Sequence, residues 1–135
     1  MARQQAVSID KDYAHAQKLR IFVGTWNING QPANNVSLTQ WLSRDFIAPD
    51  LYAIGFQELD LSKENFLFNE SSREEEWSQI VEKSLHPNAV YEQVALVRLV
   101  GIMLIIYSQV SLMIHIKNVS VDTEGTGIMH IMVSS

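Results

Sequence analysis

Two apolar runs in the first half of the chain have the composition of buried strands. Residues 19–25 are rich in β-branched and aromatic side chains, and an Asn29-Gly30 turn signal follows them. Residues 51–56 are apolar on both faces, which is typical of strands that helices cover on both sides. The pattern therefore predicts two strands, each followed by polar residues.

Apolar residues at helical spacing predict two helices. A short helix over about residues 36–45 would begin after Asn35, a residue type that often caps helix N-termini. A second helix would start with a capping box of Ser72 and Glu75 and end at His86-Pro87. The apolar positions behind these predictions are Leu38, Trp41 and Leu42 in the first helix and Trp77, Ile80, Val81 and Leu85 in the second.

Further apolar runs follow in the second half of the chain. Residues 91–98 and 101–108 predict two strands that meet near Leu99-Val100, and residues 114–121 predict a third. A last apolar piece covers residues 128–133. The order strand, helix, strand, helix and then several strands indicates a layered α/β sandwich rather than a purely parallel wound sheet.

Composition narrows the class of protein. The chain has 135 residues, a formal net charge of -5 and no cysteine, and 47% of it is apolar. A disulfide scaffold and a cysteine nucleophile are excluded, and the acidic balance argues against a nucleic-acid binder. Residues 1–20 do not resemble a signal peptide, and the apolar stretch 94–107 is shorter than the roughly 20 residues of a spanning helix. We expect one small cytosolic domain.

Two polar residues follow the two predicted strands of the first half. Asn29 comes just after the first strand and Glu58 just after the second. Ligands of open α/β sheets collect at the carboxyl ends of strands, so an amide and a carboxylate could meet at one rim. Such oxygen donors suit Mg²⁺, which is usually held by one or two carboxylates and a substrate phosphate. A plain turn residue and a surface charge are the alternative interpretations of the same two positions.

Three motifs in order make a family resemblance strong. They are RIFVGTWNING at residues 20–30, YAIGFQELDL at residues 52–61 and RLVGIML at residues 98–104. Together they resemble the inositol polyphosphate 5-phosphatases, and within these the type II branch that contains the oculocerebrorenal (Lowe) syndrome phosphatase. The resemblance covers about residues 18–129, after a leader or linker at 1–17 and before a divergent tail at 130–135.

The resemblance implies a fold and a reaction. The fold is the DNase I-like α/β sandwich of two sheets, here in part, and the reaction is Mg²⁺-dependent removal of the 5-phosphate from phosphoinositides or soluble inositol phosphates. By position, Glu58 matches the metal-ligating glutamate of the family, and Asn29 matches the asparagine that helps to hold the metal and the phosphate. An activated water would attack phosphorus in line while the cation stabilises the phosphoryl charge.

The resemblance ends after Met129, where the family continues into Gly-Asn-Lys-Gly-Gly. The later Ser-His-Leu, Gly-Asp-Leu-Asn and Ser-Asp-His segments, which supply the general base and the phosphate-binding histidines, have no match here. His15, His86, His115 and His130 match no catalytic histidine of the family. We therefore expect a truncated chain with no complete catalytic set and no turnover; the alternative is a non-catalytic isoform that acts through binding or competition. A nuclease of the same fold is disfavoured by the acidic charge and the motifs.

Surface contacts follow from the same resemblance. Phe66, Leu67 and Phe68 form an apolar triplet in a charged loop, which either packs under the domain edge or dips into a membrane beside the lipid head group. The family resemblance places the protein peripherally on endosomal or Golgi membranes. The absence of the later strands of the sandwich would expose the inner faces of residues 94–107 and 114–121. Such an exposed apolar patch drives aggregation or partner binding.

Overall fold

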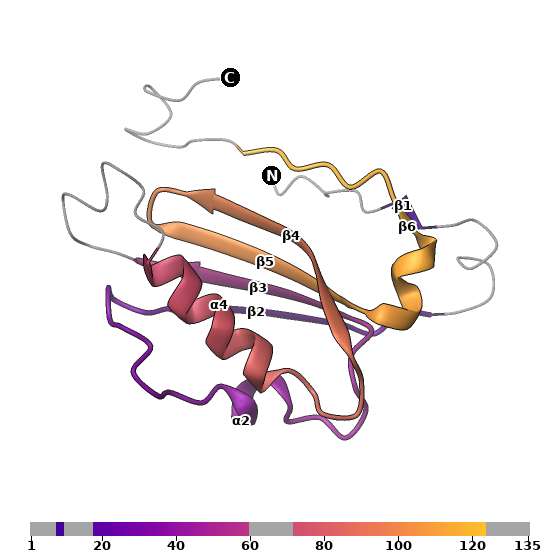
Figure 1. Cartoon of the computed structure of the whole chain (residues 1–135), viewed down its shortest axis with the longest axis horizontal. Helices are drawn as coiled ribbons and strands as arrows, with labels where there is room; N and C mark the ends of the chain where they lie inside the picture. Colours follow the sequence, from indigo (N-terminus) through magenta and orange to yellow (C-terminus); the bar gives the residue numbers. More distant parts are fainter. Residues whose placement is uncertain (1–7, 10–17, 60–71, 124–135) are drawn as a thin grey trace.

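A four-stranded mixed sheet forms the centre of the molecule. The computed structural model describes residues 8–9, 18–59 and 72–123, and its sheet has the order β2-β3-β5-β4 (Figure 1). β2 (Ile21–Asn27) and β3 (Leu51–Gln57) are parallel, while β5 (Ile102–Gln109) is antiparallel to β3 and to β4 (Tyr91–Leu99). The four predicted strands that form this sheet are therefore confirmed to within two residues at their ends, and the sheet is mixed as expected.

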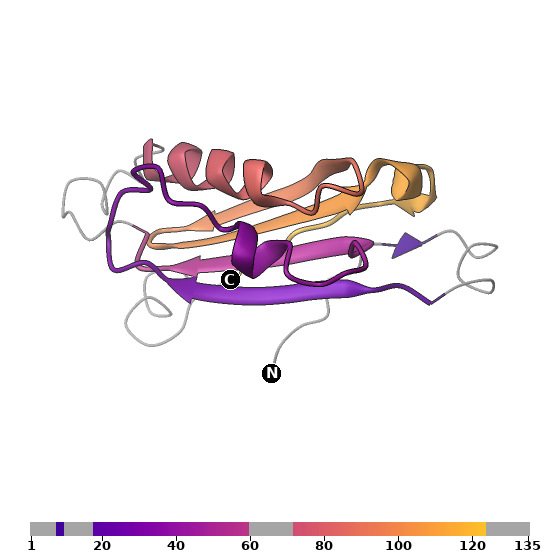
Figure 2. The same ribbon diagram turned by 90° about the horizontal axis from the view of Figure 1, so that it is seen from below.

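Both helices of the described region pack on one face of this sheet. α4 (Ser72–Ser84) runs along the sheet, and α2 (Thr39–Leu42) lies beside it near the β2 edge (Figure 2). Strand residues alternate between the two faces, so every second side chain points at the helices. The core consists of Tyr52, Ile54 and Phe56 from β3, Met103, Ile105 and Tyr107 from β5, and Leu42, Trp77 and Val81 from the helices.

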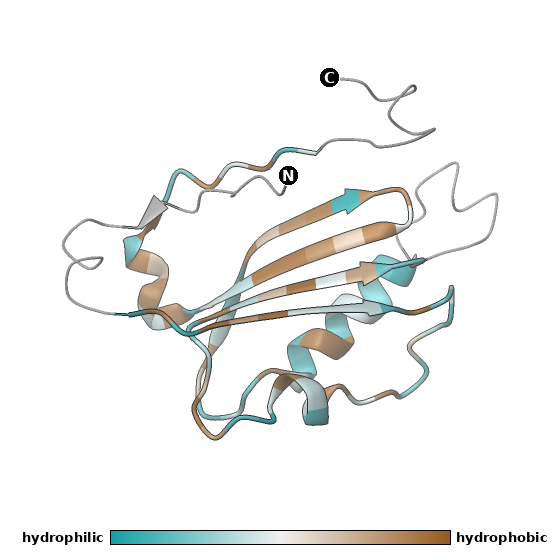
Figure 3. Ribbon diagram, turned by 180° about the vertical axis from the view of Figure 1, so that it is seen from behind, coloured by the Kyte–Doolittle hydropathy of each residue, from teal (hydrophilic) through white to brown (hydrophobic). Residues whose placement is uncertain are grey.

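The opposite face of the sheet is apolar and open. No helix of the described residues covers it, and apolar colours dominate it in the view from behind (Figure 3). Ile21 is 54% exposed, Val23 73% and Ile102 52%. The expectation that residues 51–56 are covered by helices on both sides is therefore wrong for the described region. The expectation of a buried first strand is also wrong, because β2 is an edge strand whose alternate side chains face away from the helices.

The helix predicted for residues 36–45 is much shorter than expected. α2 spans four residues, its N-cap is Leu38 rather than Asn35, and the cap makes no side-chain hydrogen bond. Three apolar positions at helical spacing fill one turn, and the C-cap, Ser43, donates a 2.6 Å hydrogen bond from its Oγ to the carbonyl oxygen of Ser84. Phe46, one residue beyond the predicted range, is exposed to solvent.

The strand predicted for residues 114–121 is also largely wrong. Residues Val110–His115 form a 3-10 helix, η1, and β6 (Ile116–Lys117) follows with two residues. β6 pairs antiparallel with β1 (Ser8–Ile9), so the leader contributes a short strand. His115 lies in η1 rather than on a strand. The apolar piece at 128–133 and the triplet Phe66, Leu67 and Phe68 lie outside the described residues.

The predicted end of α4 is confirmed, and His86, which follows it, has a structural role. The helix ends at Ser84, just before His86-Pro87. His86 is buried, its Nε2–H donates to the carbonyl oxygen of Asp45 at 2.8 Å, and its Nδ1 accepts from the Asn88 amide at 3.2 Å. Its backbone amide donates to the Tyr52 hydroxyl, which donates to the carbonyl oxygen of Leu42 at 2.6 Å. His86 is thus a structural residue.

No described helix has the length and apolar character to cross a membrane.

Candidate functional site

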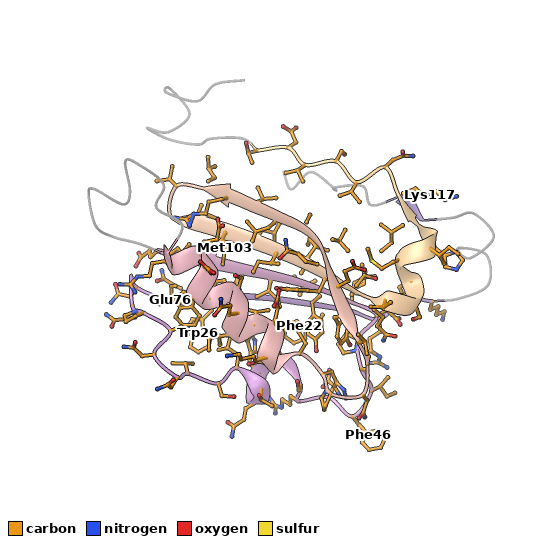
Figure 4. The ribbon with its side chains drawn as sticks, in the orientation of Figure 1. Phe22, Trp26, Phe46, Glu76, Met103 and Lys117 are labelled. Carbon is orange, nitrogen blue, oxygen red and sulfur yellow. The ribbon has the colours of Figure 1, made fainter. Side chains whose placement is uncertain are left out.

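Asn29 and Glu58 lie at the same end of the sheet, as the sequence predicted. β2 and β3 are parallel and in register from Ile21 opposite Leu51 to Asn27 opposite Gln57. Both strands therefore end at one edge, and the residues that follow them continue side by side. We call residues 28–31 and 58–59 the rim. It lies at the end where the labelled Trp26 and Glu76 are found in Figure 4.

Backbone hydrogen bonds join the two halves of the rim. The Ile28 amide donates to the carbonyl oxygen of Gln57 at 3.0 Å, and the Gly30 amide donates to the carbonyl oxygen of Glu58 at 2.7 Å. The ladder between the parallel strands thus continues past their ends. Asn29, between the two donors, is held beside Glu58.

The rim is built from left-handed backbone. Asn29 has φ 51° and Gly30 has φ 65°, and the Gln31 amide donates to the carbonyl oxygen of Ile28 at 3.0 Å, as in a type I′ turn. Glu58 has φ 52°, a conformation that costs energy for a residue with a side chain and that clusters at functional sites. The expected Asn29-Gly30 turn is confirmed.

The first turns of α4 hold the chain that leaves the rim. Trp77 Nε1 donates to the carbonyl oxygen of Gln31 at 3.1 Å, and Glu76 Oε2 accepts from the Ala33 amide at 3.2 Å. Arg73 lies 3.5 Å from the same carboxylate oxygen of Glu76. Sequence reasoning missed these positioning residues, because it read Trp77 as core and Glu76 as solvated helix surface. The available signal was the hydrogen-bonding capacity of the Trp77 indole and of the Glu76 carboxylate, which stand beside the apolar stripe of the helix.

The β4–β5 hairpin supports the rim from the other side. The Leu59 amide donates to the carbonyl oxygen of Gly101 at 2.9 Å, so the residue after Glu58 is tied to the hairpin turn. Val100 in that turn has φ 51°, an outlier for a β-branched residue. Arg98 Nε donates to the carbonyl oxygen of Val100 at 2.8 Å, which fixes the turn. Sequence patterns give no sign of a left-handed valine.

The two side chains of the rim offer oxygen donors to solvent. Asn29 and Glu58 are both exposed. A carboxylate and an amide oxygen fit a hard cation such as Mg²⁺ or Ca²⁺, which takes its remaining ligands from water and substrate phosphate. Within the described residues no group of three or more histidine and acidic side chains forms a metal cluster. The rim thus offers two oxygen ligands to such a cation.

Comparisons with known proteins point to one group of enzymes. Residues 24–134 match the Endonuclease/Exonuclease/phosphatase family 2. The chain is 48% identical over 129 residues to the mouse type II inositol 1,4,5-trisphosphate 5-phosphatase, a match that covers 96% of this chain and 13% of that protein. It is 30% identical over 135 residues to human synaptojanin-2, covering 86% of this chain and 9% of that protein. The chain thus spans a small part of these relatives.

A solved structure carries the same fold. It is the inositol polyphosphate 5-phosphatase domain of SpSynaptojanin in complex with inositol (1,4)-bisphosphate and a calcium ion. The TM-score is 0.57 at 30% sequence identity, and the match covers 69% of this chain and 28% of that chain. The mixed sheet described above is thus part of a DNase I-like fold. The relatives and the solved structure that it resembles are inositol polyphosphate 5-phosphatases. The chain belongs to the Endonuclease/Exonuclease/phosphatase family 2.

Proposed function

We propose that the chain provides part of the active site of a phosphatase that removes the 5-phosphate from inositol phosphates or phosphoinositides with the help of Mg²⁺. The names of the relatives support the substrate class. The observation that carries the proposal is the 2.7 Å hydrogen bond from Gly30 to Glu58, because it holds the predicted amide and carboxylate at one exposed rim.

Each rim residue has a distinct role in this proposal. The Glu58 carboxylate would hold the divalent cation, and the Asn29 amide would help to hold the cation and the phosphate. A bound cation supplies stabilisation of the negative charge on the phosphoryl oxygens. The left-handed backbone at both residues presents the side chains to solvent, where a head group can reach them.

A general base is not among the residues that we assign. None of the four histidines takes that role, and His86 is engaged in structural hydrogen bonds. We therefore expect the 135-residue polypeptide to bind a cation and a phosphorylated head group without hydrolysing it. The second candidate function follows from the same residues: a non-catalytic protein that binds or competes for inositides.

Cation binding tests the proposed rim directly. Mg²⁺ at about ten times its dissociation constant should stabilise the folded chain by about 1.4 kcal/mol and raise its melting temperature by about 5 °C. Glu58→Gln should remove this shift in scanning fluorimetry, because the neutral amide keeps the shape and loses the charge. The matched control is Glu92→Gln, another exposed carboxylate, on β4 away from the rim. Equal shifts in the two variants would reject the site.

Phosphate release distinguishes the two candidate functions. The assay uses a 5-phosphorylated inositide and Mg²⁺, with the wild-type chain and Glu58→Gln side by side. Turnover that depends on Glu58 would establish a competent enzyme and contradict the expected inactivity. Mg²⁺ binding without turnover, together with inhibition of an active 5-phosphatase, would favour the non-catalytic function.

Membrane contact through Phe66, Leu67 and Phe68 is a further part of the proposal. The triplet would enter a bilayer shallowly beside the lipid head group, which would place the protein peripherally at endosomal or Golgi membranes. Replacing Phe66 and Phe68 with serine in a complete domain should lower activity on liposomes and spare soluble inositol phosphates. Equal losses on both substrates would instead assign the triplet to packing.

A further inference from the structure

A nearly bare phenylalanine projects from the loop between α2 and β3. Phe46 is 95% exposed, and its neighbour Ile47 is 56% exposed. In Figure 4, Phe46 points away from the rest of the molecule. An aromatic ring with this exposure gains nothing from the core of the chain, so its apolar surface is available to a partner.

Two cationic side chains line a depression that Ile47, the neighbour of this phenylalanine, also lines. Lys18, Arg20 and Ile47 are among the residues that line a hollow of about 420 Å³. In the described part of the chain neither Lys18 nor Arg20 forms a salt bridge, and both are exposed. The carboxylate of Asp50, also in the lining, is engaged by the Arg20 backbone amide at 2.7 Å. With two cations and one carboxylate, the lining carries a net positive charge, although the whole chain has a net charge of -5.

The shape and the charges of this region favour a peptide over a bilayer. A flat lipid surface cannot enter a hollow, whereas a chain segment can place one side chain in it. Asp50 in the lining would repel a uniformly anionic surface, while a peptide can position its carboxylates at Lys18 and Arg20 alone. The docking region also lies far from the rim. Lys18 and Arg20 precede β2, whose seven residues span about 23 Å, so a partner bound there leaves the rim accessible.

We propose that Phe46, Ile47, Lys18 and Arg20 form a docking surface for an acidic peptide segment of a partner protein. An apolar side chain of the peptide packs on Phe46 and Ile47, and flanking Asp or Glu carboxylates pair with Lys18 and Arg20. Aromatic anchors with nearby charge pairs are the usual energetic centres of such contacts.

The test uses the full chain and a fluorescent synthetic peptide, Glu-Glu-Asp-Leu-Phe-Asp-Glu-Glu, in an anisotropy titration. Binding should weaken about tenfold with Phe46→Ser and by a similar factor with Lys18→Glu, and it should weaken as salt rises from about 0.05 M to about 0.5 M. Ile114→Ser, which alters a side chain that is 77% exposed in η1, is the matched control and should bind as the wild type does. A peptide with Ser-Ser in place of Leu-Phe should bind much more weakly.

Several outcomes would overturn the proposal. These are an absence of peptide binding, equal affinity for wild type and Phe46→Ser, or equal affinity for the Ser-Ser peptide. A second experiment measures sedimentation of the chain with phosphatidylserine vesicles. If Phe46→Ser abolished vesicle binding but left peptide binding unchanged, the surface would be assigned to lipid and not to a peptide. Because Phe46 has few contacts, its replacement should leave the circular dichroism spectrum unchanged, and Ile47→Ser provides a second variant.

Discussion

The Gly30 amide donates a 2.7 Å hydrogen bond to the carbonyl oxygen of Glu58. This bond joins two chain reversals that are 28 positions apart in sequence and that both use left-handed backbone. The orientation of the Glu58 carboxylate therefore depends on a turn in another segment. Substitutions in the turn should change the rim even where they leave its side chains untouched.

Gly30→Ala should lower both stability and cation affinity. The φ of 65° at Gly30 is unfavourable for a residue with a Cβ, at a cost of about 1–2 kcal/mol. Relaxation of the turn would weaken the bond to Glu58 and loosen the rim. Urea unfolding gives the change in free energy, and Mg²⁺ titration calorimetry gives the affinity.

Asn29→Gly is the matched control for this prediction. Glycine accepts the φ of 51° at position 29 at least as well as asparagine does, so stability should stay within about 0.5 kcal/mol of the wild type. The amide oxygen is lost, so Mg²⁺ affinity should still fall. If Gly30→Ala proved as stable as the wild type, the tight coupling of the two reversals would be refuted.

Two glycines in neighbouring strands should respond very differently to alanine. A Cβ at Gly24 would lie 2.5 Å from Cζ2 of Trp41, whereas a Cβ at Gly55 would meet its nearest atom, Cγ2 of Thr25, at 3.4 Å. Gly24→Ala forces the indole to move in a packed aromatic cluster and should cost about 1–3 kcal/mol. Gly55→Ala should change the free energy of unfolding by less than about 1 kcal/mol. Urea denaturation of the two variants in parallel measures the contrast, and equal losses would contradict it.

The parts of the fold that the sequence predicted well are those fixed by local pattern. The pattern that predicted α4 combined a capping-box motif at Ser72 and Glu75, one apolar stripe and a proline stop, and the helix ends where the pattern put it. The hairpin of β4 and β5 is bounded by a valine-glycine pair between two apolar runs. The rim was predicted because ligands of open α/β sheets collect at the carboxyl ends of strands, where the residues after β2 and β3 could meet.

The parts that failed depend on contacts beyond the local pattern. The helix predicted for residues 36–45 is the single turn of α2, and its C-cap Ser43 is hydrogen-bonded to the end of α4, a tertiary contact that apolar spacing does not record. The open face of the sheet is another case, since apolar strand residues do not reveal whether a second layer covers them. The support of the rim by Trp77 arises from a tertiary hydrogen bond that no sequence period records, and Arg98 acts through a hydrogen bond inside the hairpin turn.

Alkaline pH should destabilise the chain through its buried tyrosines. Burial raises the pKa of Tyr91 and Tyr107, and the negative charge of Glu82 raises the pKa of Tyr107 further. The folded state therefore keeps these phenols protonated at a pH where the unfolded chain, with a pKa near 10, releases its protons. Stability should be constant below about pH 10 and should fall as the pH rises above that value.

Denaturant unfolding at a series of pH values, with tyrosinate absorbance, measures this effect. Tyr107→Phe should reduce the loss of stability at high pH, because the variant has one fewer proton to release on unfolding. A folded chain in which all four tyrosines titrate with a midpoint near 10 would contradict the prediction.

The open sheet face should drive self-association of the isolated chain. Val23 and Ile102 are 73% and 52% exposed on the side of the sheet that no described helix covers. Threonine keeps the β-branch that strands favour and adds a hydroxyl, so Val23→Thr with Ile102→Thr should raise solubility with little change in fold. Static light scattering over a concentration series measures the association.

Val90→Thr is the matched control, because Val90 is also 73% exposed but precedes β4, and it should leave self-association unchanged. Reversible two-state melting of a wild-type monomer at high concentration would argue against a sticky face, since apolar contact between copies makes the melting temperature depend on concentration.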